Sequence, residues 1–257
     1  MVESENIEII FAEFGPNRGD HGGVKIKNDR LDPSYQTFKK YFPNASIKVY
    51  TDYPDNFKNY VESDSNFTIS KVDINDYDFL NNSHPRRGYR CSDYFRIIGM
   101  LESKYDYCIY TDSDMYVCSQ DVLQGISLSN IYGLCVPANP RLLFEKDIYL
   151  GVDAPQSNTE IFKKGISFTK MHSFNAAPLF FSTKHSEARS MLEKYCQIFE
   201  KNPMRGPSCL NLASISSKYF PCLLPFQWCV SRDNIDDEII LHVGKAQVAN
   251  KYFGKKQ

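Results

Sequence analysis

The sequence predicts an α/β fold, with a mostly parallel central sheet that carries helices on both faces. Short apolar segments of strand length alternate along the chain with segments of helical periodicity, which is the pattern of strand–helix–strand units. The chain has 257 residues, 42% of them hydrophobic, so it is long enough to bury one large core. No internal repeat or low-complexity linker divides it. We therefore expect a single domain across residues 1–257.

The first part of the chain predicts three strands and one helix. The helix is expected at Tyr35–Phe42 and stops before Pro43, because a residue that precedes proline disfavours helical geometry. The glycine-rich stretch after the first strand, residues 15–23, matches no phosphate-binding motif. The strands are expected at Ile7–Phe14, Ala45–Thr51 and Phe67–Val72.

The clearest helix is predicted at Ser92–Ser103. Its apolar residues recur at i, i+3, i+4 and i+7, which gives one apolar stripe; they are Tyr94, Ile97, Ile98 and Leu101. Ser92 is of a residue type that caps helix N-termini. Asp93 and Arg96 flank the stripe three residues apart, so a surface ion pair is one interpretation of them.

The most informative motif follows this helix. Tyr107–Tyr110 is an apolar strand, and the chain leaves it through Asp112-Ser113-Asp114. Two carboxylates at the carboxyl end of a buried strand can hold a divalent cation against a diphosphate. A second Asp-x-Asp, at Asp76-Tyr77-Asp78, lacks the apolar run before it. We expect that second motif to be a solvated turn.

The rest of the chain continues the alternation. A helix is predicted at Glu187–Lys201, and residues 137–172 form a long irregular stretch of the kind that often serves as a lid or binding loop. Further strands are expected at Tyr132–Val136, Pro178–Ser182, Leu223–Val230 and Ile239–Val243.

Charge and composition exclude several classes of function. The formal net charge is −1, so no basic surface for nucleic acid is expected. No apolar run has the length of a signal peptide or a membrane span. The 8 cysteines form no Cys-x-x-Cys pair and several lie in apolar runs, which indicates free thiols in a reducing compartment. These features predict a soluble, cytoplasmic protein.

Short motifs in a fixed order point to one family. They are Tyr94-Phe95-Arg96, Asp112-Ser113-Asp114, Phe174-Asn175-Ala176-Ala177, and His242 with Gly244 and Lys245. Their order resembles the GT-A nucleotide-sugar glycosyltransferases, in particular the branch that holds glycogenin and the bacterial lipooligosaccharide galactosyltransferases. The likeness runs from Ile7 to about Lys245. It implies a GT-A-like (Rossmann-like) domain with a nucleotide-sugar and metal half at 1–118 and an acceptor half at 119–257.

The resemblance implies a metal-dependent glycosyltransferase. Such an enzyme moves a sugar from a nucleotide-sugar donor, here expected to be UDP-linked, to a hydroxyl of a glycan, glycolipid or glycoprotein. Negative charge develops on the departing diphosphate, and Mn²⁺ or Mg²⁺ neutralises it. Two carboxylates and one imidazole suit Mn²⁺, so the implied ligands are Asp112, Asp114 and His242.

The resemblance also implies the residues that contact the donor. Asp93, Arg96 and Asn175 are the expected catalytic group. Arg96 would contact the donor sugar or phosphate, and Asp93 would bind donor hydroxyls or orient Arg96. Lys245 would meet the diphosphate as a point charge. The nucleoside is expected at the carboxyl end of the first strand, and further donor contacts are expected from Phe11, Ala12, Glu13, Ser113 and Ala176.

The sequence departs from the family pattern at several places. His242-Val243-Gly244-Lys245 has shorter gaps than the family's His-x-x-Gly-x-x-Lys, Ala177 replaces a glycine, and Glu13 replaces an aspartate. Pro207 stands where retaining members carry an amide side chain, which leaves retention and inversion both open. Inversion needs a carboxylate base beside the acceptor hydroxyl, and the candidates are Glu145, Asp147, Asp153 and Glu160.

Two other functions fit parts of the sequence. A phosphatase of the haloacid dehalogenase type also has a strand that ends in Asp-x-Asp, but normally on its first strand. A non-catalytic glycosyltransferase-like binding module is the second, and the retained Asp112, Asp114 and His242 argue against it. The motifs do not specify the donor sugar, the acceptor, the linkage or the oligomeric state.

Overall fold

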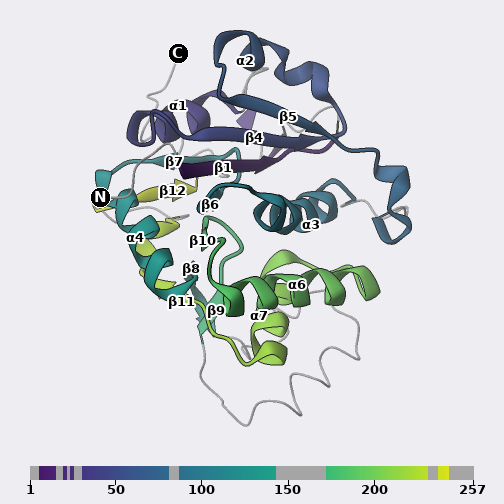
Figure 1. The fold of residues 1–257 in the computed structure, drawn as a ribbon, viewed down its shortest axis with the longest axis vertical. Helices are drawn as coiled ribbons and strands as arrows, with labels where there is room; N and C mark the ends of the chain where they lie inside the picture. Colours follow the sequence, from purple (N-terminus) through teal and green to yellow (C-terminus); the bar gives the residue numbers. More distant parts are fainter. Residues whose placement is uncertain are drawn as a thin grey trace.

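The computed structural model describes residues 6–15, 20–21, 24–25, 31–80, 87–142, 172–230 and 237–242. They build one large sheet with helices packed on both faces (Figure 1). The predicted α/β fold class with a mostly parallel central sheet is therefore confirmed. The division into a nucleotide half and an acceptor half stays a prediction.

One half of the sheet is parallel. β1 (Ile7–Ala12) lies between β4 (Ser46–Thr51) and β6 (Tyr107–Tyr110), and β5 (Phe67–Lys71) lies beyond β4. Each neighbouring pair among these strands runs in the same direction. All residues of β1 are buried, as expected for a strand that helices cover on both faces.

The other half of the sheet is mixed. β10 (Leu179–Ser182) is antiparallel to both β6 and β8 (Leu134–Leu142). β11 (Cys222–Leu224) is parallel to β8 at the end of the strand order, and β9 (His172–Phe174) is antiparallel to β8. The resulting order is β11-β8-β10-β6-β1-β4-β5.

In the part of the chain that the structure describes, two small strand pairs lie outside the large sheet. β7 (Met115–Val117) follows β6 directly and pairs antiparallel with β12 (Ile240–His242). This pair joins the segment after β6 to the end of the described chain. The second pair is β2 (Asp20–His21) with β3 (Val24–Lys25).

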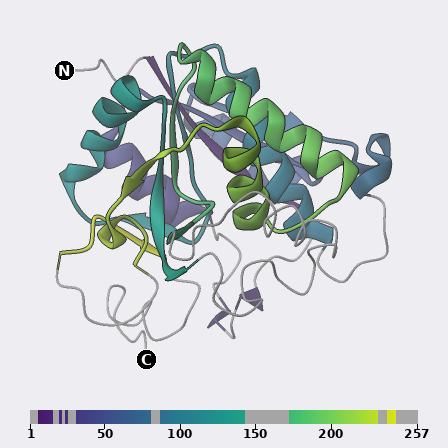
Figure 2. The ribbon, with the colours of Figure 1, turned by 90° about the horizontal axis from the view of Figure 1, so that it is seen from below.

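The long helices cover opposite faces of the sheet (Figures 1 and 2). α3 (Arg87–Glu102), α6 (Ser186–Lys201) and α7 (Gly206–Ser217) lie on one face, and α4 (Leu123–Tyr132) lies on the other. Among the described residues, the remaining α-helices are α1 (Asp32–Tyr41) and α2 (Lys58–Ser63), and short 3-10 helices lie at Pro54–Phe57, Ile74–Asp76, Asp78–Leu80, Gln120–Val122 and Phe226–Trp228. Within the described part of the chain, no helix is both long enough and apolar enough to cross a bilayer.

Glycines let two helices approach the sheet closely. A Cβ at Gly99 of α3 would lie 2.8 Å from Ile10 of β1, and one at Gly125 of α4 would lie 2.6 Å from the ring of Phe180 on β10. Each helix is therefore pressed against the sheet at a position where a side chain would not fit.

Several predicted elements have different boundaries. α3 begins at Arg87, so Ser92 is inside the helix and not its cap; its hydroxyl donates to the carbonyl of Ala12 at 2.7 Å. Tyr132 ends α4, and β8 begins only at Leu134, because Gly133 makes the turn between them with a φ of 77°. The predicted strand Leu223–Val230 is wrong beyond Leu224, where Pro225 follows and a 3-10 helix begins.

The irregular stretch predicted at 137–172 is partly wrong. β8 continues through it to Leu142, and β9 begins at His172. Residues 143–171 lie outside the described residues. The prediction for Asp76-Tyr77-Asp78 is confirmed, since both aspartates are exposed at short 3-10 turns.

No disulfide joins any of the 8 cysteines, all of which lie among the described residues, as the sequence predicts. Five of the 8 are buried, and Cys118, Cys222 and Cys229 are half-buried. The reducing compartment inferred from them stays a prediction.

Candidate functional site

The Asp-x-Asp motif leaves the sheet at the carboxyl end of β6. The backbone N–H of Met115 donates to the carbonyl of Asp112 at 3.1 Å, so the motif is a tight turn into β7. In the β7–β12 pair, His242 is the register partner of Met115. This pairing carries an imidazole from the far end of the described chain to the two carboxylates.

The three predicted ligands lie together. One ligand atom from each of Asp112, Asp114 and His242 falls within 4.8 Å of the others. Nε2 of His242 is 3.4 Å from Oδ2 of Asp114. Two carboxylate oxygens and one imidazole nitrogen form a donor set that suits Mn²⁺ or Mg²⁺, so these residues fit a divalent cation.

The cluster is open to solvent on one side. Asp114 is buried, whereas the side chains of Asp112 and His242 are 31% and 33% exposed. Burial acts to lower the pKa of His242, but the Asp114 carboxylate outweighs it and holds that pKa well above its usual range. The Cys229 side chain also hydrogen-bonds His242. A second partner of this kind fixes the orientation of a ligating imidazole.

Arg96 is buried beside the cluster, on α3. Its Nη2 atom lies 2.6 Å from Oδ1 of Asp93 and 3.8 Å from Oδ1 of Asp112. Its Nη1 atom donates to the carbonyl of Ala176 at 2.6 Å, and its guanidinium carbon lies 4.7 Å from the centre of the Tyr110 ring. Burial alone would lower the pKa of Arg96, but Tyr110 and the two carboxylates raise it above its ordinary value. A permanent cation is thus fixed next to the Asp-x-Asp turn.

Asp93 is buried as well, so the interpretation of a surface ion pair is wrong. The backbone N–H of Gly206, at the start of α7, hydrogen-bonds its carboxylate. Burial raises the pKa of Asp93 even though Arg96 and this N–H both favour the charged form. The hydroxyl of Tyr195 donates to its backbone carbonyl at 2.8 Å. With its carboxylate between Arg96 and α7, Asp93 holds Arg96 in position, and its role toward a donor stays a prediction.

Asn175 lies at the turn between β9 and β10. Its backbone N–H donates to the carbonyl of Pro137 at 2.9 Å, and its side-chain oxygen accepts a hydrogen bond of 2.7 Å from the amide of Asn139. The side chain is only partly buried. Because Asn139 occupies the oxygen, Asn175 is oriented by a neighbour on β8 that the sequence did not single out.

The expected nucleoside-binding residues differ in exposure. Phe11 and Ala12 are buried in the core, and the half-buried Glu13 follows at the end of the strand. Ser113 is buried between the two aspartates, and its hydroxyl has no hydrogen-bond partner among the described residues. Their roles toward a donor stay predictions.

Lys245 and Gly244 lie outside the described residues, as do the four candidate bases Glu145, Asp147, Asp153 and Glu160. Pro207 is described: it lies in the first turn of α7, where its carbonyl accepts from the amide of Asn211 at 2.6 Å.

Besides Asn139, three described residues at the site were not predicted. Tyr110 donates its hydroxyl to Asp112 and places its ring against Arg96. Gly206 meets Asp93, and Cys229 meets His242. A tyrosine two residues before the first aspartate is a local signal that could have been noticed. The other two contacts join distant segments, and no sequence spacing indicates them.

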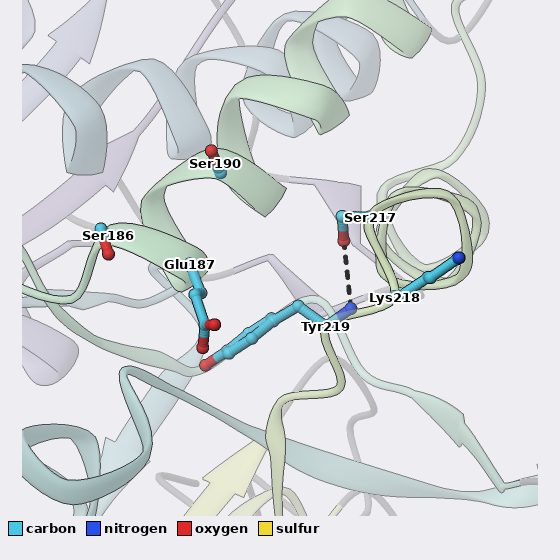
Figure 3. A pocket seen from close by; sticks show the side chains of 6 residues that line it. All are labelled: Ser186, Glu187, Ser190, Ser217, Lys218 and Tyr219. Atoms are coloured by element: carbon cyan, nitrogen blue, oxygen red, sulfur yellow. Dashed lines mark hydrogen bonds between the residues drawn. The ribbon is translucent and has the colours of Figure 1, made fainter.

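A separate pocket lies at the other end of β6. It has a volume of about 270 Å³ and lies between the start of α6 and the end of α7 (Figure 3). It is lined by Ser186, Glu187, Ser190, Ser217, Lys218 and Tyr219. Because β10 is antiparallel to β6, Ser182 near the start of α6 is paired with Tyr107 at the beginning of β6. The pocket is therefore remote from Asp112, and we do not assign it to the site.

This chain is similar to known proteins in structure rather than in sequence. The sequence matches no protein-family model, and no curated protein matches it. The structure is similar to the galactosyltransferase LgtC in complex with donor and acceptor sugar analogues, with a TM-score of 0.56 and 14% identity over 91% of this chain and 86% of LgtC. It is also similar to mouse xyloside xylosyltransferase 1, with a TM-score of 0.57 and 6% identity over 91% of this chain and 96% of that one.

The chain has the GT-A fold. The resemblance seen in the sequence is thus confirmed for the fold. Sequence identities of 6% and 14% support a statement about the fold and not about the function. A third GT-A-like neighbour is the 4-diphosphocytidyl-2C-methyl-D-erythritol synthase from Anaerococcus prevotii, with a TM-score of 0.55 and 14% identity over 97% of this chain and 99% of that one. The GT-A fold therefore accommodates more than one chemistry, and function must be argued from the site.

Proposed function

We propose that this GT-A protein is a metal-dependent glycosyltransferase that moves a sugar from a UDP-linked donor to a hydroxyl of a glycan, glycolipid or glycoprotein. The proposal rests on one observation, the grouping of Asp112, Asp114 and His242 within 4.8 Å at the carboxyl end of a central strand. Ligands of open α/β sheets bind at that edge. The phosphatase alternative is not carried forward, because the motif follows β6 and the fold is GT-A.

The chain's own residues suit a diphosphate leaving group. A bound Mn²⁺ or Mg²⁺ would supply Lewis-acid stabilisation of the charge that develops on the diphosphate. Arg96 adds a second positive charge, held by Asp93 and by the carbonyl of Ala176. Such a preoriented charge stabilises a developing anion without reorganisation during the reaction.

The acceptor side is proposed around Asn175. Its side-chain amide is oriented by Asn139. Asn175 directly follows β9, which pairs with β8 and therefore lies in the part of the sheet away from β1 and β4. With Pro207 in the first turn of α7, no side-chain amide is available at that position. The anomeric configuration of the product therefore decides between retention and inversion, and it can be read by NMR from the same reaction.

The test is a donor screen with matched variants. The protein is incubated with UDP- and GDP-sugars, Mn²⁺ and a panel of glycan acceptors, and the release of nucleoside diphosphate is measured with and without EDTA. Asp114→Ala should lower metal-dependent turnover by about 10²–10³-fold, the scale of losing a key electrostatic stabiliser. Asp78→Ala, in the exposed second Asp-x-Asp, is the control and should leave turnover unchanged. Full metal-dependent turnover by Asp114→Ala would contradict the proposal.

A second candidate function follows from the neighbouring synthase. Its name describes the formation of a diphosphocytidyl compound, which favours nucleotidyl transfer to a phosphorylated alcohol as the alternative. The same screen separates the two, because nucleotidyl transfer from a nucleoside triphosphate releases pyrophosphate. If the protein binds a donor but shows no turnover with any combination of donor, metal ion and acceptor, the result would instead support the non-catalytic binding module.

A further inference from the structure

Two cysteines face each other across the last two strands of the sheet, away from the proposed site. Cys135 on β8 and Cys222 on β11 are register partners in a parallel pair. Register partners in a sheet project their side chains to the same face. The two thiols are in contact, since the side chains hydrogen-bond each other.

The backbone spacing suits a covalent bond between them. Neighbouring strands lie about 4.8 Å apart, and disulfides join Cα atoms that are about 4.4–6.8 Å apart. A pair in register therefore needs no shift of either strand along its axis. β11 comes last in the strand order and has only 3 residues, so it can adjust to the geometry of the bond more easily than an interior strand.

The two thiols differ in access and reactivity. Cys135 is fully buried, and burial raises the pKa of its thiol, which suppresses the nucleophilic thiolate. Cys222 is half-buried and is flanked by Leu223, which is exposed. An external reagent therefore meets Cys222 first.

We propose that Cys135 and Cys222 form a peroxide-sensitive thiol pair that oxidises reversibly to an intrachain disulfide. The thiolate of Cys222 attacks hydrogen peroxide, which gives a sulfenic acid and hydroxide. The thiol of Cys135 then displaces the sulfenic oxygen, so that an S–S bond forms and water leaves. Both sulfurs are oxidised and the peroxide is reduced. The product ties the edge strand β11 covalently to β8.

The test is a mapping experiment on the folded, full-length chain. The protein is treated with hydrogen peroxide in native buffer, free thiols are blocked with iodoacetamide, and the protein is digested with chymotrypsin without reduction. Chymotrypsin suits the purpose because cleavage after Tyr132 and after Tyr219 separates these cysteines from Cys118 and Cys209. The expected product is a linked pair of peptides that has lost two hydrogen atoms and is released by dithiothreitol.

Variants make the assignment specific. Cys222→Ser should abolish the linked pair, and Cys118→Ser, which removes another half-buried cysteine, should retain it. Cys135→Ala should stop the reaction at a sulfenic acid on Cys222 that dimedone traps. Because Cys135 is in the core and its variant can lose the fold, the wild-type map is decisive. Failure of wild-type protein to give the linked pair overturns the proposal, as does a link from Cys135 to any other cysteine in Cys222→Ser.

Discussion

Gly206 is the point at which the start of α7 meets the buried ion pair of the site. A Cβ at this position would lie 2.5 Å from Oδ1 and 3.1 Å from Cγ of Asp93, and 3.2 Å from Cβ of Ala176. Non-bonded carbon atoms normally stay about 3.5–4.0 Å apart. In Gly206→Ala, either α7 or Asp93 must therefore move by several tenths of an ångström or more.

The loss of stability in Gly206→Ala depends on how freely the groups around this contact can move. Asp93 cannot yield freely, because its carboxylate holds Arg96 at 2.6 Å and accepts from the Gly206 N–H. Overpacking of a rigid buried site costs about 1–3 kcal/mol. We expect Gly206→Ala to lower the free energy of unfolding by that amount. It should also reduce kcat for donor turnover, because a displaced Asp93 no longer orients Arg96.

The assay is urea unfolding followed by circular dichroism, together with steady-state kinetics. Pro207→Ala is the matched control: it changes the same turn of α7 but adds no atom near Asp93. It should lose only about 0.4–1 kcal/mol, the ordinary effect of removing proline from a compatible position. If Gly206→Ala is as stable as Pro207→Ala and as active as the wild type, the reasoning about this contact is refuted.

Two further predictions concern buried polar groups. Glu8 on β1 is buried, one of its oxygens has no partner among the described residues, and burial raises its pKa above 4.5. The folded state then holds the proton longer than the unfolded state, so stability falls as the pH rises above 4.5 through the raised value. Glu8→Gln should flatten this part of the stability–pH curve measured by urea unfolding, and parallel curves for variant and wild type would contradict the prediction. Tyr110→Phe removes the hydroxyl that donates to Asp112 but keeps the ring against Arg96; it should cost about 1 kcal/mol of stability, since water can replace the bond at a partly exposed carboxylate. An unchanged urea midpoint would show that this hydrogen bond has no net effect.

The strands of the parallel half could be predicted from the sequence to within two residues. β1, β4 and β6 are mostly buried runs bounded by polar or turn-forming residues, and such a strand needs no more information than that. β5, at the edge of the sheet, alternates apolar and polar residues, which is the other pattern that predicts a strand. The amphipathic α6 was also predicted to within one residue of its start, because a clear pattern within its own sequence marks it. Its apolar residues form one stripe, which packs against the rest of the protein.

The two helices that were not predicted, α4 and α7, lack an apolar stripe of the kind that marks α6. α7 is buried nearly all round, with small and polar residues such as Ser208, Asn211 and Ser214 in the interior, so no apolar stripe marks it. α4 contains glycine, serine and asparagine, which are poor helix formers, and its existence depends on packing against β10. Both helices depend on contacts with the rest of the protein, and the residue pattern within one segment does not reveal such contacts.

The grouping of the three candidate ligands could be predicted only from the order of motifs. Asp112 and Asp114 follow a buried strand, so their place at the sheet edge has a local signal. His242 reaches them through the β7–β12 pair, and nothing near His242 in the sequence indicates its partner strand. The contacts that orient the site, from Gly206 to Asp93 and from Cys229 to His242, likewise depend on the folded chain.

The central claim is that one divalent cation is held by Asp112, Asp114 and His242, and pulsed electron paramagnetic resonance of bound Mn²⁺ tests it most directly. Nitrogen coupled to the metal reports an imidazole ligand. We expect one Mn²⁺ per chain with a single coupled nitrogen in the wild type. The coupling should disappear in His242→Gln and persist in His185→Gln, which changes the histidine at the N-terminus of α6. A nitrogen coupling that survives in His242→Gln, or a wild-type protein that binds no Mn²⁺, would contradict the account.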